Sequence, residues 1–593
     1  AAWRAVLSAA AAPAAGPAAR DLARLRLARR CLAEGTPRLA AALLENPGSG
    51  AHALLRGEAL AAAGDTVAAL ESFVEYGARS RAPVSERYPA LRRAADWAAP
   101  FANRLGESSH ADLCRALGEV GESDRAIPLL RARTLPPIGA GADLARAELD
   151  ASLLARARRF DEAIAAYRAL GARPSLPEGA AARSACALAR ASRGERSFAT
   201  MDSAFVAAAR LDREGSIADR AAWERAREWE DTREAREAAA IFAWADSAIR
   251  SPDLKAVARV HEALSWKRAG LPDSARAAVA GAPASDPIGV FWRARFSLEA
   301  GDTTAAVRDF ALAARLAPVS YEGVRAREES ARIGRPIPVA EPTEAAPAEG
   351  VAAARDDSDA RALEIRLLEA LGWSETAADR RRRCAREAEP DRARACMDAL
   401  EEAGVFRVGQ RSLVPDARFD YPPAYPGDVM SAAAAESLPP ALLWAIMRQE
   451  SAYDRSARSK AGALGLLQLL PSTASQVAGR RISEDSLTGA ALNVRLGARY
   501  VKTLLKEFGD LRAVLASYNA GEDAVRRWNR DRGAVDDEWV ERIPYRETRD
   551  YVKQVYLGWR MYEAIYRVRG DANRGGIGID RGVKEKDGTA PAP

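Results

Sequence analysis

Histidine is nearly absent from this sequence of 593 residues. The three histidines are His52, His110 and His261, so none lies in the C-terminal half. This excludes a Ser-His-Asp or Cys-His catalytic centre there and argues against a histidine-rich metal site. Chemistry in that half must rest on carboxylates, hydroxyls, amides or aromatic rings, and we expect no cofactor and no metal.

Cysteine is also scarce. The five cysteines are Cys31, Cys114, Cys186, Cys384 and Cys396. None forms a C-x-x-C pair, which argues against a structural zinc site. Buried free thiols are the expected state, although Cys384 and Cys396 would pair if two helices brought them together. Cysteine usage therefore leaves the cellular compartment open.

Long apolar runs and blocks of one charge are missing too. No uncharged stretch of about 20 apolar residues is present, so we expect no transmembrane helix. The sequence also lacks a long basic block, so nothing suggests a nucleic-acid partner. The net charge of +6 fits attraction to an anionic polymer, but it also fits an ordinary near-neutral surface. The chain begins at Ala1, which suits an exported protein trimmed of its leader and suits an arbitrary boundary equally well.

Alanine, leucine and arginine dominate what is there, and alternating β-branched residues are rare. These residues favour helix, so the sequence predicts a nearly all-α protein. The chain is too long for one hydrophobic core, which indicates several domains or a repeat array.

The first ~330 residues repeat one pattern, in which a helix ends at a small turn and the next helix carries alanines and one large apolar residue. The turns begin at Ala62-Ala63-Gly64-Asp65, Val120-Gly121-Glu122, Arg159-Phe160-Asp161, Ala269-Gly270 and Ala300-Gly301-Asp302. The spacing is irregular but resembles tetratricopeptide repeats. Stacked α-hairpins of this kind form a superhelix with an extended binding surface, and ordinary helical packing is the alternative.

Composition shifts divide the chain into four parts. Residues 1–332 are predicted to form the helical-repeat superhelix. Residues 333–425 are predicted to hold a proline-rich linker and connecting helices. Residues 426–570 are predicted to form a compact helical domain, and residues 571–593 a disordered tail.

The most informative helix ends at Glu450. Leu442, Leu443, Ile446 and Met447 form an apolar stripe, and Glu450 continues it at i+4 and i+3. A carboxylate on a core-facing row is costly unless it is paired or protonated. Desolvation, a position near the helix C-terminus and the lack of a cation on the same face would all raise the pKa of Glu450. The alternative is a frayed last turn with Glu450 in water, and the helix alone does not decide between the two.

Aromatic residues gather in the same domain, and their flat apolar faces with polar edges suit pyranose rings as well as core packing. They are Trp444, Tyr453, Tyr500, Phe508, Tyr518, Trp528, Trp539, Tyr545, Tyr551, Tyr556, Trp559, Tyr562 and Tyr566. A glycine-containing segment at 459–471 would let the backbone approach a ligand closely.

Several short segments follow one another in a specific order. They are Glu450-Ser451, residues 465–471 (Gly-Leu-Leu-Gln-Leu-Leu-Pro), residues 493–500, residues 517–521 (Ser-Tyr-Asn-Ala-Gly), Ile543-Pro544, Glu547-Thr548-Arg549 and Tyr551-Val552. This ordered set resembles the soluble lytic murein transglycosylase family, whose goose-type-lysozyme-like catalytic domain follows an N-terminal α-superhelix. Family members usually carry methionine where this chain has Leu467 and Leu470, a change that conserves volume.

The resemblance implies a periplasmic enzyme that cleaves peptidoglycan glycan strands between N-acetylmuramic acid and N-acetylglucosamine and forms a 1,6-anhydro end. Glu450 would be the sole acid/base. Tyr518 would stabilise the transition state or orient Glu450, and Tyr551 would lie in either groove or core. The residues implied to bind substrate are Ser451, Ser459, Gln468, Tyr500, Tyr518, Asn519, Glu547 and Tyr551.

The lack of an evident second carboxylate matters, since hydrolytic glycosidases generally use two. The nearest candidate in sequence, Asp454, is typical of a loop residue. A single acid/base fits intramolecular attack by a tethered hydroxyl. Two alternatives stay open: a scaffold that binds glycan without turnover, and a hydrolase like goose-type lysozyme. The superhelix is also a candidate surface for a cell-wall protein partner.

Overall fold

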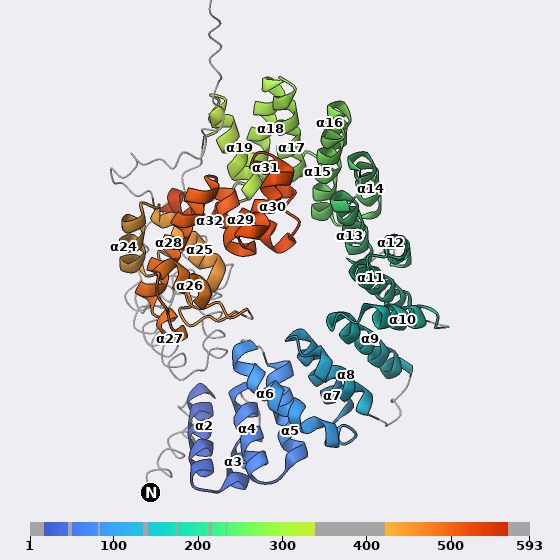
Figure 1. Cartoon of the computed structure of the whole chain (residues 1–593), viewed down its shortest axis with the longest axis vertical. Helices are drawn as coiled ribbons and strands as arrows, with labels where there is room; N and C mark the ends of the chain where they lie inside the picture. Colours follow the sequence, from blue (N-terminus) through green and yellow to red (C-terminus); the bar gives the residue numbers. More distant parts are fainter. Residues whose placement is uncertain are drawn as a thin grey trace, which may run out of the picture. The chain divides into compact units, whose positions relative to one another are not determined.

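The computed structural model is mainly helical in the part of the chain that it describes (Figure 1). In that part the β-structure is limited to two isolated bridges, which join Leu464 to Arg458 and to Leu469. The predicted all-α class is confirmed. The described residues are 17–45, 50–80, 84–133, 140–173, 176–212, 216–232, 234–338, 421–459 and 461–566.

Internal contacts divide the chain into two compact units. Among the described residues, the first unit ends at residue 258, and the second holds residues 259–338 and 421–566. The predicted boundaries at 332/333 and 425/426 remain predictions. Most of the expected linker and the whole expected tail lie outside the described residues.

The first unit is a succession of helices, each packed against its neighbours in the chain (Figure 1). They are α2 (Pro17–Ala33), α3 (Pro37–Leu43), α4 (Gly50–Ala62), α5 (Thr66–Val74), α6 (Val84–Ala98), α7 (Glu107–Glu119), α8 (Ser123–Ala132), α9 (Ala140–Arg156), α10 (Phe160–Gly171), α11 (Glu178–Gly194), α12 (Phe198–Leu211), α13 (Ser216–Thr232) and α14 (Ala235–Ala248), with the short segments η1 (Glu75–Arg79) and η2 (Ala99–Phe101).

The hairpin of α4 and α5 shows how the repeated turn works. Gly64 has φ +84°, a conformation that strains other residues. Asp65 then caps α5 by accepting a hydrogen bond from the backbone N–H of Ala68. Phe73 is fully buried, and a Cβ on Gly57 would lie 2.7 Å from its ring. Small residues on one helix therefore make room for the large residue on the next, as the repeat pattern predicts.

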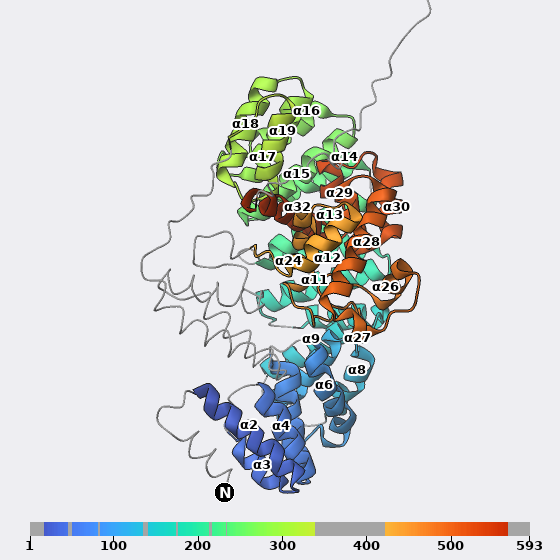
Figure 2. The ribbon, with the colours of Figure 1, turned by 90° about the vertical axis from the view of Figure 1, so that its left-hand side faces the viewer.

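The second unit begins with five more helices of the repeat kind, of which α17, α18 and α19 pack on one another (Figure 2). They are α15 (Pro252–Arg268), whose first residues count with the first unit, α16 (Pro272–Ala280), α17 (Pro287–Glu299), α18 (Thr303–Leu316) and α19 (Tyr321–Arg332).

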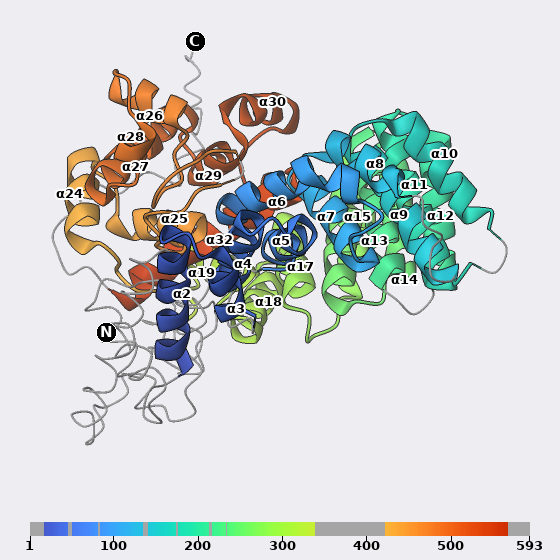
Figure 3. The same ribbon diagram turned by 90° about the horizontal axis from the view of Figure 1, so that it is seen from below.

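The C-terminal helices of this unit enclose a large apolar core in which α25 lies against α32 (Figure 3). These helices are α24 (Pro426–Glu436), α25 (Pro440–Ser451), α26 (Pro471–Ala478), α27 (Glu484–Leu487), α28 (Ala490–Phe508), α29 (Leu511–Ala520), α30 (Glu522–Arg532), α31 (Asp537–Glu541) and α32 (Arg546–Ile565).

Cys31, Cys114 and Cys186 are buried free thiols. Cys384 and Cys396 lie outside the described residues. Across the described ranges, no helix is long and apolar enough to cross a bilayer. The same ranges contain no cluster of three or more His, Cys, Asp or Glu side chains arranged to hold a metal ion.

Candidate active site

Glu450 lies in the last turn of α25, beyond a fully buried apolar stripe that includes Ile446 and Met447. The side chain continues this stripe and is itself half-buried. The helix ends at Ser451, and Ala452 and Tyr453 follow with φ values of 47° and 67°. Two consecutive left-handed residues other than glycine are strained, and such strain is concentrated at functional sites.

The hydroxyl of Tyr551, on α32, donates a 2.6 Å hydrogen bond to Oε1 of Glu450. Burial raises the pKa of Glu450 to about 7; the Tyr551 hydrogen bond opposes this rise, and the negative charge of Glu547 adds to it. Among the residues that the structure describes, no lysine or arginine pairs with Glu450. The geometry thus matches the buried alternative for Glu450 rather than the frayed turn.

A tight loop at 464–470 lies beside this helix end. Leu464 and Leu469 exchange backbone hydrogen bonds of 2.9 and 3.0 Å, which closes the loop. The Ser451 hydroxyl donates to the carbonyl of Leu466 at 2.8 Å, and the Tyr518 hydroxyl donates to the carbonyl of Leu467 at 2.7 Å. Two predicted site residues therefore hold the loop in place through its backbone.

Asn493, on α28, fixes the same loop and is fully buried. Its Oδ1 accepts from the N–H of Leu467 at 2.8 Å, and its Nδ2 donates to the carbonyls of Leu464 and Leu487 at 2.9 Å each. The sequence interpretation used this residue only as the start of a motif and missed its role. An asparagine on the buried face of an amphipathic helix was the available signal.

Gln468 and Ser459 join this loop to the segment before it. Gln468 has φ +43°, and its Nε2 donates to the carbonyls of Ala457 and Gly465 at 3.0 and 2.9 Å. The Ser459 hydroxyl accepts from the N–H of Ala463 at 3.0 Å. Both predicted residues thus stabilise the local backbone.

The remaining predicted residues lie on α28, α29 and α32. The rings of Tyr500 and Tyr518 are 5.3 Å apart, and the Tyr500 hydroxyl donates to Glu522 at 2.9 Å. Asn519 accepts from the buried Thr548 hydroxyl at 2.6 Å, which joins α29 to α32. The sequence placed Thr548 in the motif Glu547-Thr548-Arg549 but gave no sign of this contact.

Carboxylates near Glu450 differ in their surroundings. Oδ1 of Asp454 accepts two hydrogen bonds from Ser456, at 2.9 and 2.6 Å, so Asp454 stabilises its own loop. Glu547 is exposed in the first turn of α32, close enough for its charge to raise the pKa of Glu450.

Most of the aromatic residues of this domain belong to its core. Those that are buried are Trp444, Tyr453, Trp528, Trp539, Tyr551, Tyr556, Trp559 and Tyr562. Those that are partly or largely exposed are Tyr500, Phe508, Tyr518, Tyr545 and Tyr566. Tyr551 is a core residue that also contacts Glu450, and its place in a glycan groove remains a prediction.

Residues 429–540 match the family model described as Transglycosylase SLT domain. This part of the chain is similar to the SLT domain family. A stretch of 155 residues of this chain is 34% identical to the soluble lytic murein transglycosylase of Escherichia coli. A stretch of 131 residues is 37% identical to the soluble lytic murein transglycosylase of Salmonella typhimurium. These stretches cover 25% and 21% of this chain, and only 23% and 20% of the relatives' length. The resemblance stated from the motifs is confirmed.

Solved structures extend the likeness beyond the SLT domain. The 70 kDa soluble lytic transglycosylase of Escherichia coli aligns with a TM-score of 0.61 and 19% identity, covering 97% of this chain and 90% of that one. An inactive variant of lytic transglycosylase Slt from Pseudomonas aeruginosa aligns with a TM-score of 0.50 and 19% identity, covering 92% and 88%. At this identity the likeness shows the fold. It confirms a superhelix of α-hairpins followed by a lysozyme-like domain.

Proposed function

We propose that this chain is a lytic transglycosylase of the periplasm that cleaves peptidoglycan glycan strands. The proposal is carried by the state of Glu450, which lies in the region that matches the SLT domain. This residue is half-buried, accepts a hydrogen bond from Tyr551 and has a pKa of about 7. A carboxylic acid that stays protonated near neutral pH is what glycosidic cleavage requires of its general acid.

The proposed bond is the β-1,4 linkage from N-acetylmuramic acid to N-acetylglucosamine. Glu450 gives its proton to the glycosidic oxygen as the bond to C1 breaks. The resulting carboxylate takes a proton from the muramyl 6-hydroxyl, whose oxygen bonds to C1. Glu450 ends protonated as it began, no water is consumed, and the product carries a 1,6-anhydro ring. Throughout, the Tyr551 hydroxyl stabilises the carboxylate that forms.

The other predicted site residues have supporting roles in this proposal. Ser451 and Gln468 hold the 464–470 loop as one wall of the glycan groove. Tyr518 adjoins this loop through its bond to the Leu467 carbonyl, with Tyr500 beside it, and Asn519, Ser459 and Glu547 are proposed as further glycan contacts. The Tyr518 hydroxyl is engaged with the Leu467 carbonyl, while its ring lies near enough to Glu450 for that charge to raise the tyrosine pKa, after the larger effect of burial.

One observation favours hydrolysis as a second candidate. Glu547 is an exposed carboxylate whose charge reaches Glu450, and a second carboxylate is what a water-activating glycosidase needs. Digestion of purified peptidoglycan by the full chain, followed by mass spectrometry, separates the candidates. Soluble fragments with anhydro ends support the transglycosylase, whereas reducing ends that take up ¹⁸O from labelled water support the hydrolase. Binding without release of fragments would mean a glycan-binding module and would overturn both.

A further inference from the structure

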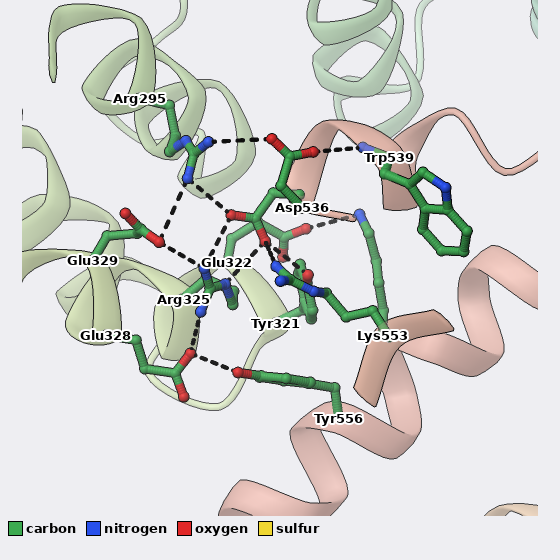
Figure 4. A network of polar contacts seen from close by, with 12 residues as sticks. Arg295, Tyr321, Glu322, Arg325, Glu328, Glu329, Asp536, Trp539, Lys553 and Tyr556 are labelled. Atoms are coloured by element: carbon green, nitrogen blue, oxygen red, sulfur yellow. Dashed lines mark hydrogen bonds and ion pairs between the residues drawn. The ribbon is translucent and has the colours of Figure 1, made fainter. Parts of the chain in front are cut away.

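A buried network of charges joins repeat helices α17 and α19 to helix α31 (Figure 4). Asp537, the first residue of α31, is 1% exposed and accepts hydrogen bonds from Tyr321 at 2.8 Å, Arg325 at 2.9 Å and Arg295 at 3.2 Å. Burial alone would raise the pKa of Asp537, but the charges of Arg325 and Arg295 outweigh it and hold this pKa well below its usual range. The helix before α32 is therefore anchored to the repeats.

Helix α32 is held by the same repeats. Nζ of Lys553 donates to Glu322, on α19, at 3.0 Å and to Glu541, at the end of α31, at 2.7 Å. One turn further on, the Tyr556 hydroxyl donates to Glu328 of α19 at 2.8 Å. Glu322 and Glu541 are 7% and 3% exposed, so the ion pairs are shielded from solvent. We call Lys553, Glu322 and Glu541 the α32 clamp.

The clamp and the catalytic contact lie on opposite faces of one turn. Lys553 follows Tyr551 by two residues, which places the two side chains about 200° apart around a helix. Tyr551 reaches Glu450 on α25, whereas Lys553 reaches Glu322 on α19. Helix α32 packs against both α25 and α19 (Figure 3). A rotation of α32 that breaks one contact thus moves the other.

We propose that Glu322 and Lys553 are positioning residues of the active site, which fix the rotation of α32 so that the Tyr551 hydroxyl stays on Glu450. This makes repeat helix α19 part of the catalytic unit. Buried ion pairs contribute little net stability, but two carboxylates from different helices hold an ammonium in one place. A displacement of about 1 Å at a reacting group costs up to about 100-fold in rate, so such fixing has a large effect. The kinetic part of this inference depends on the proposed function.

The test is a double-mutant cycle between Glu322→Gln and Tyr551→Phe in the full chain. Two quantities are measured: turnover of peptidoglycan, as kcat and KM, and the pKa of Glu450. The pKa comes from ¹³C-carboxyl NMR, with the signal assigned by its loss in Glu450→Gln. We expect Glu322→Gln to lower kcat about 10-fold with little change in KM, and to raise the pKa of Glu450. In the Tyr551→Phe variant, adding Glu322→Gln should change kcat and the pKa of Glu450 very little further. The effects of two residues that act through one contact are not additive.

The direction of the pKa change separates positioning from simple electrostatics. Removing the charge of Glu322 would by itself lower the pKa of Glu450, whereas losing the Tyr551 hydrogen bond raises it. Glu322→Asp keeps the charge but withdraws the carboxylate, so it should act in the same direction as Glu322→Gln. The matched control is Glu162→Gln on α10, which removes an exposed ion pair with Arg159 and should change neither quantity.

An unchanged or lowered pKa of Glu450 in both Glu322 variants, with circular dichroism as in the wild type, would overturn the inference. So would additive effects of Glu322→Gln and Tyr551→Phe. The NMR titration needs no turnover. If the wild type fails to release fragments while the pKa shifts as expected, the proposed function is wrong and the positioning inference holds.

Discussion

The hydroxyl of Tyr551 donates a 2.6 Å hydrogen bond to Oε1 of Glu450, which joins two residues 101 positions apart in the chain. The bond stabilises the charged carboxylate and so opposes the rise in pKa that burial causes. Glu450 must act in both protonation states in the proposed reaction. Tyr551 therefore stabilises the charged form of Glu450, while burial favours the protonated form.

Removing this hydroxyl should slow the reaction without unfolding the protein. Hydrogen bonds to charged groups are worth about 1.5–3 kcal/mol, so we expect Tyr551→Phe to lower kcat about 10- to 100-fold. The pKa of Glu450 should rise above its value of about 7, which would move the alkaline limb of the pH–rate profile upward. Steady-state kinetics across pH measure both. Tyr545→Phe is the control, since Tyr545 is 53% exposed and should tolerate the change. A Tyr551→Phe enzyme with wild-type kcat would refute this role.

Replacement of Glu450 itself should abolish turnover and leave the fold intact. Glutamine has nearly the same shape but cannot exchange the proton, and general acid–base catalysis contributes about 10²–10⁴-fold. Fragment release from peptidoglycan should therefore fall at least about 100-fold in Glu450→Gln. Circular dichroism should match the wild type. Near-normal release would mean that another group is the acid.

Some of this site could be predicted from the sequence, for reasons of local geometry. The spacing of Glu450 from Ile446 and Met447 fixes its row on the helix, and the structure confirms that this row is buried. The turn at Gly64 and Asp65 likewise follows from local backbone and capping preferences. Such features depend on residues within one or two turns of each other.

Other features depend on contacts between distant segments, which periodicity does not reveal. Nothing local pairs Tyr551 with Glu450, or sends the Tyr518 hydroxyl to the Leu467 carbonyl. Asn493 looked like one helix residue among many, yet it bonds three backbone groups. The clamp on α32 was also missed, because Lys553 and Glu322 lie 231 positions apart.

The raised pKa of Glu450 should also make stability depend on pH. In the unfolded chain the pKa returns to 4.5, so the folded state binds the proton more tightly. The stability that this provides is fully present below pH 4.5 and is lost as pH rises through about 7. We expect the unfolding free energy of the wild type to fall by about 3 kcal/mol relative to Glu450→Gln across this window. Denaturant unfolding of both proteins at several pH values measures it, and a constant difference would show that Glu450 is not perturbed.

The thermal stability of the second unit should depend on the charge of Asp537. Its neutralisation removes the fully buried carboxylate between Arg325 and Arg295 and leaves these two half-buried cations with Glu329 as the carboxylate that they share. Breaking a buried ion pair from one side costs about 3–5 kcal/mol, so Asp537→Asn should markedly lower the thermal midpoint. Asp273→Asn is the matched control, because Asp273 is 86% exposed beside Arg276. Exposed pairs contribute about 0–1 kcal/mol, and equal midpoints for the two variants would contradict the importance of this network.

Two glycines of the site region allow a direct test of how tightly the 464–470 loop is packed. Gly462 and Gly465 have similar φ values, +84° and +77°, so alanine at either position carries a similar backbone cost of about 1–2 kcal/mol. A Cβ on Gly462 would meet nothing within 4 Å, whereas one on Gly465 would lie 2.4 Å from Nδ2 of Asn493 and 2.5 Å from the Leu487 carbonyl. Gly465→Ala should therefore cost a further ~1–3 kcal/mol in unfolding free energy, and it should lower kcat because the loop is displaced from Glu450. Calorimetry of the two variants measures the loss of unfolding free energy, and turnover of peptidoglycan measures kcat. Equal losses would mean that the loop yields freely and that Asn493 does not fix it.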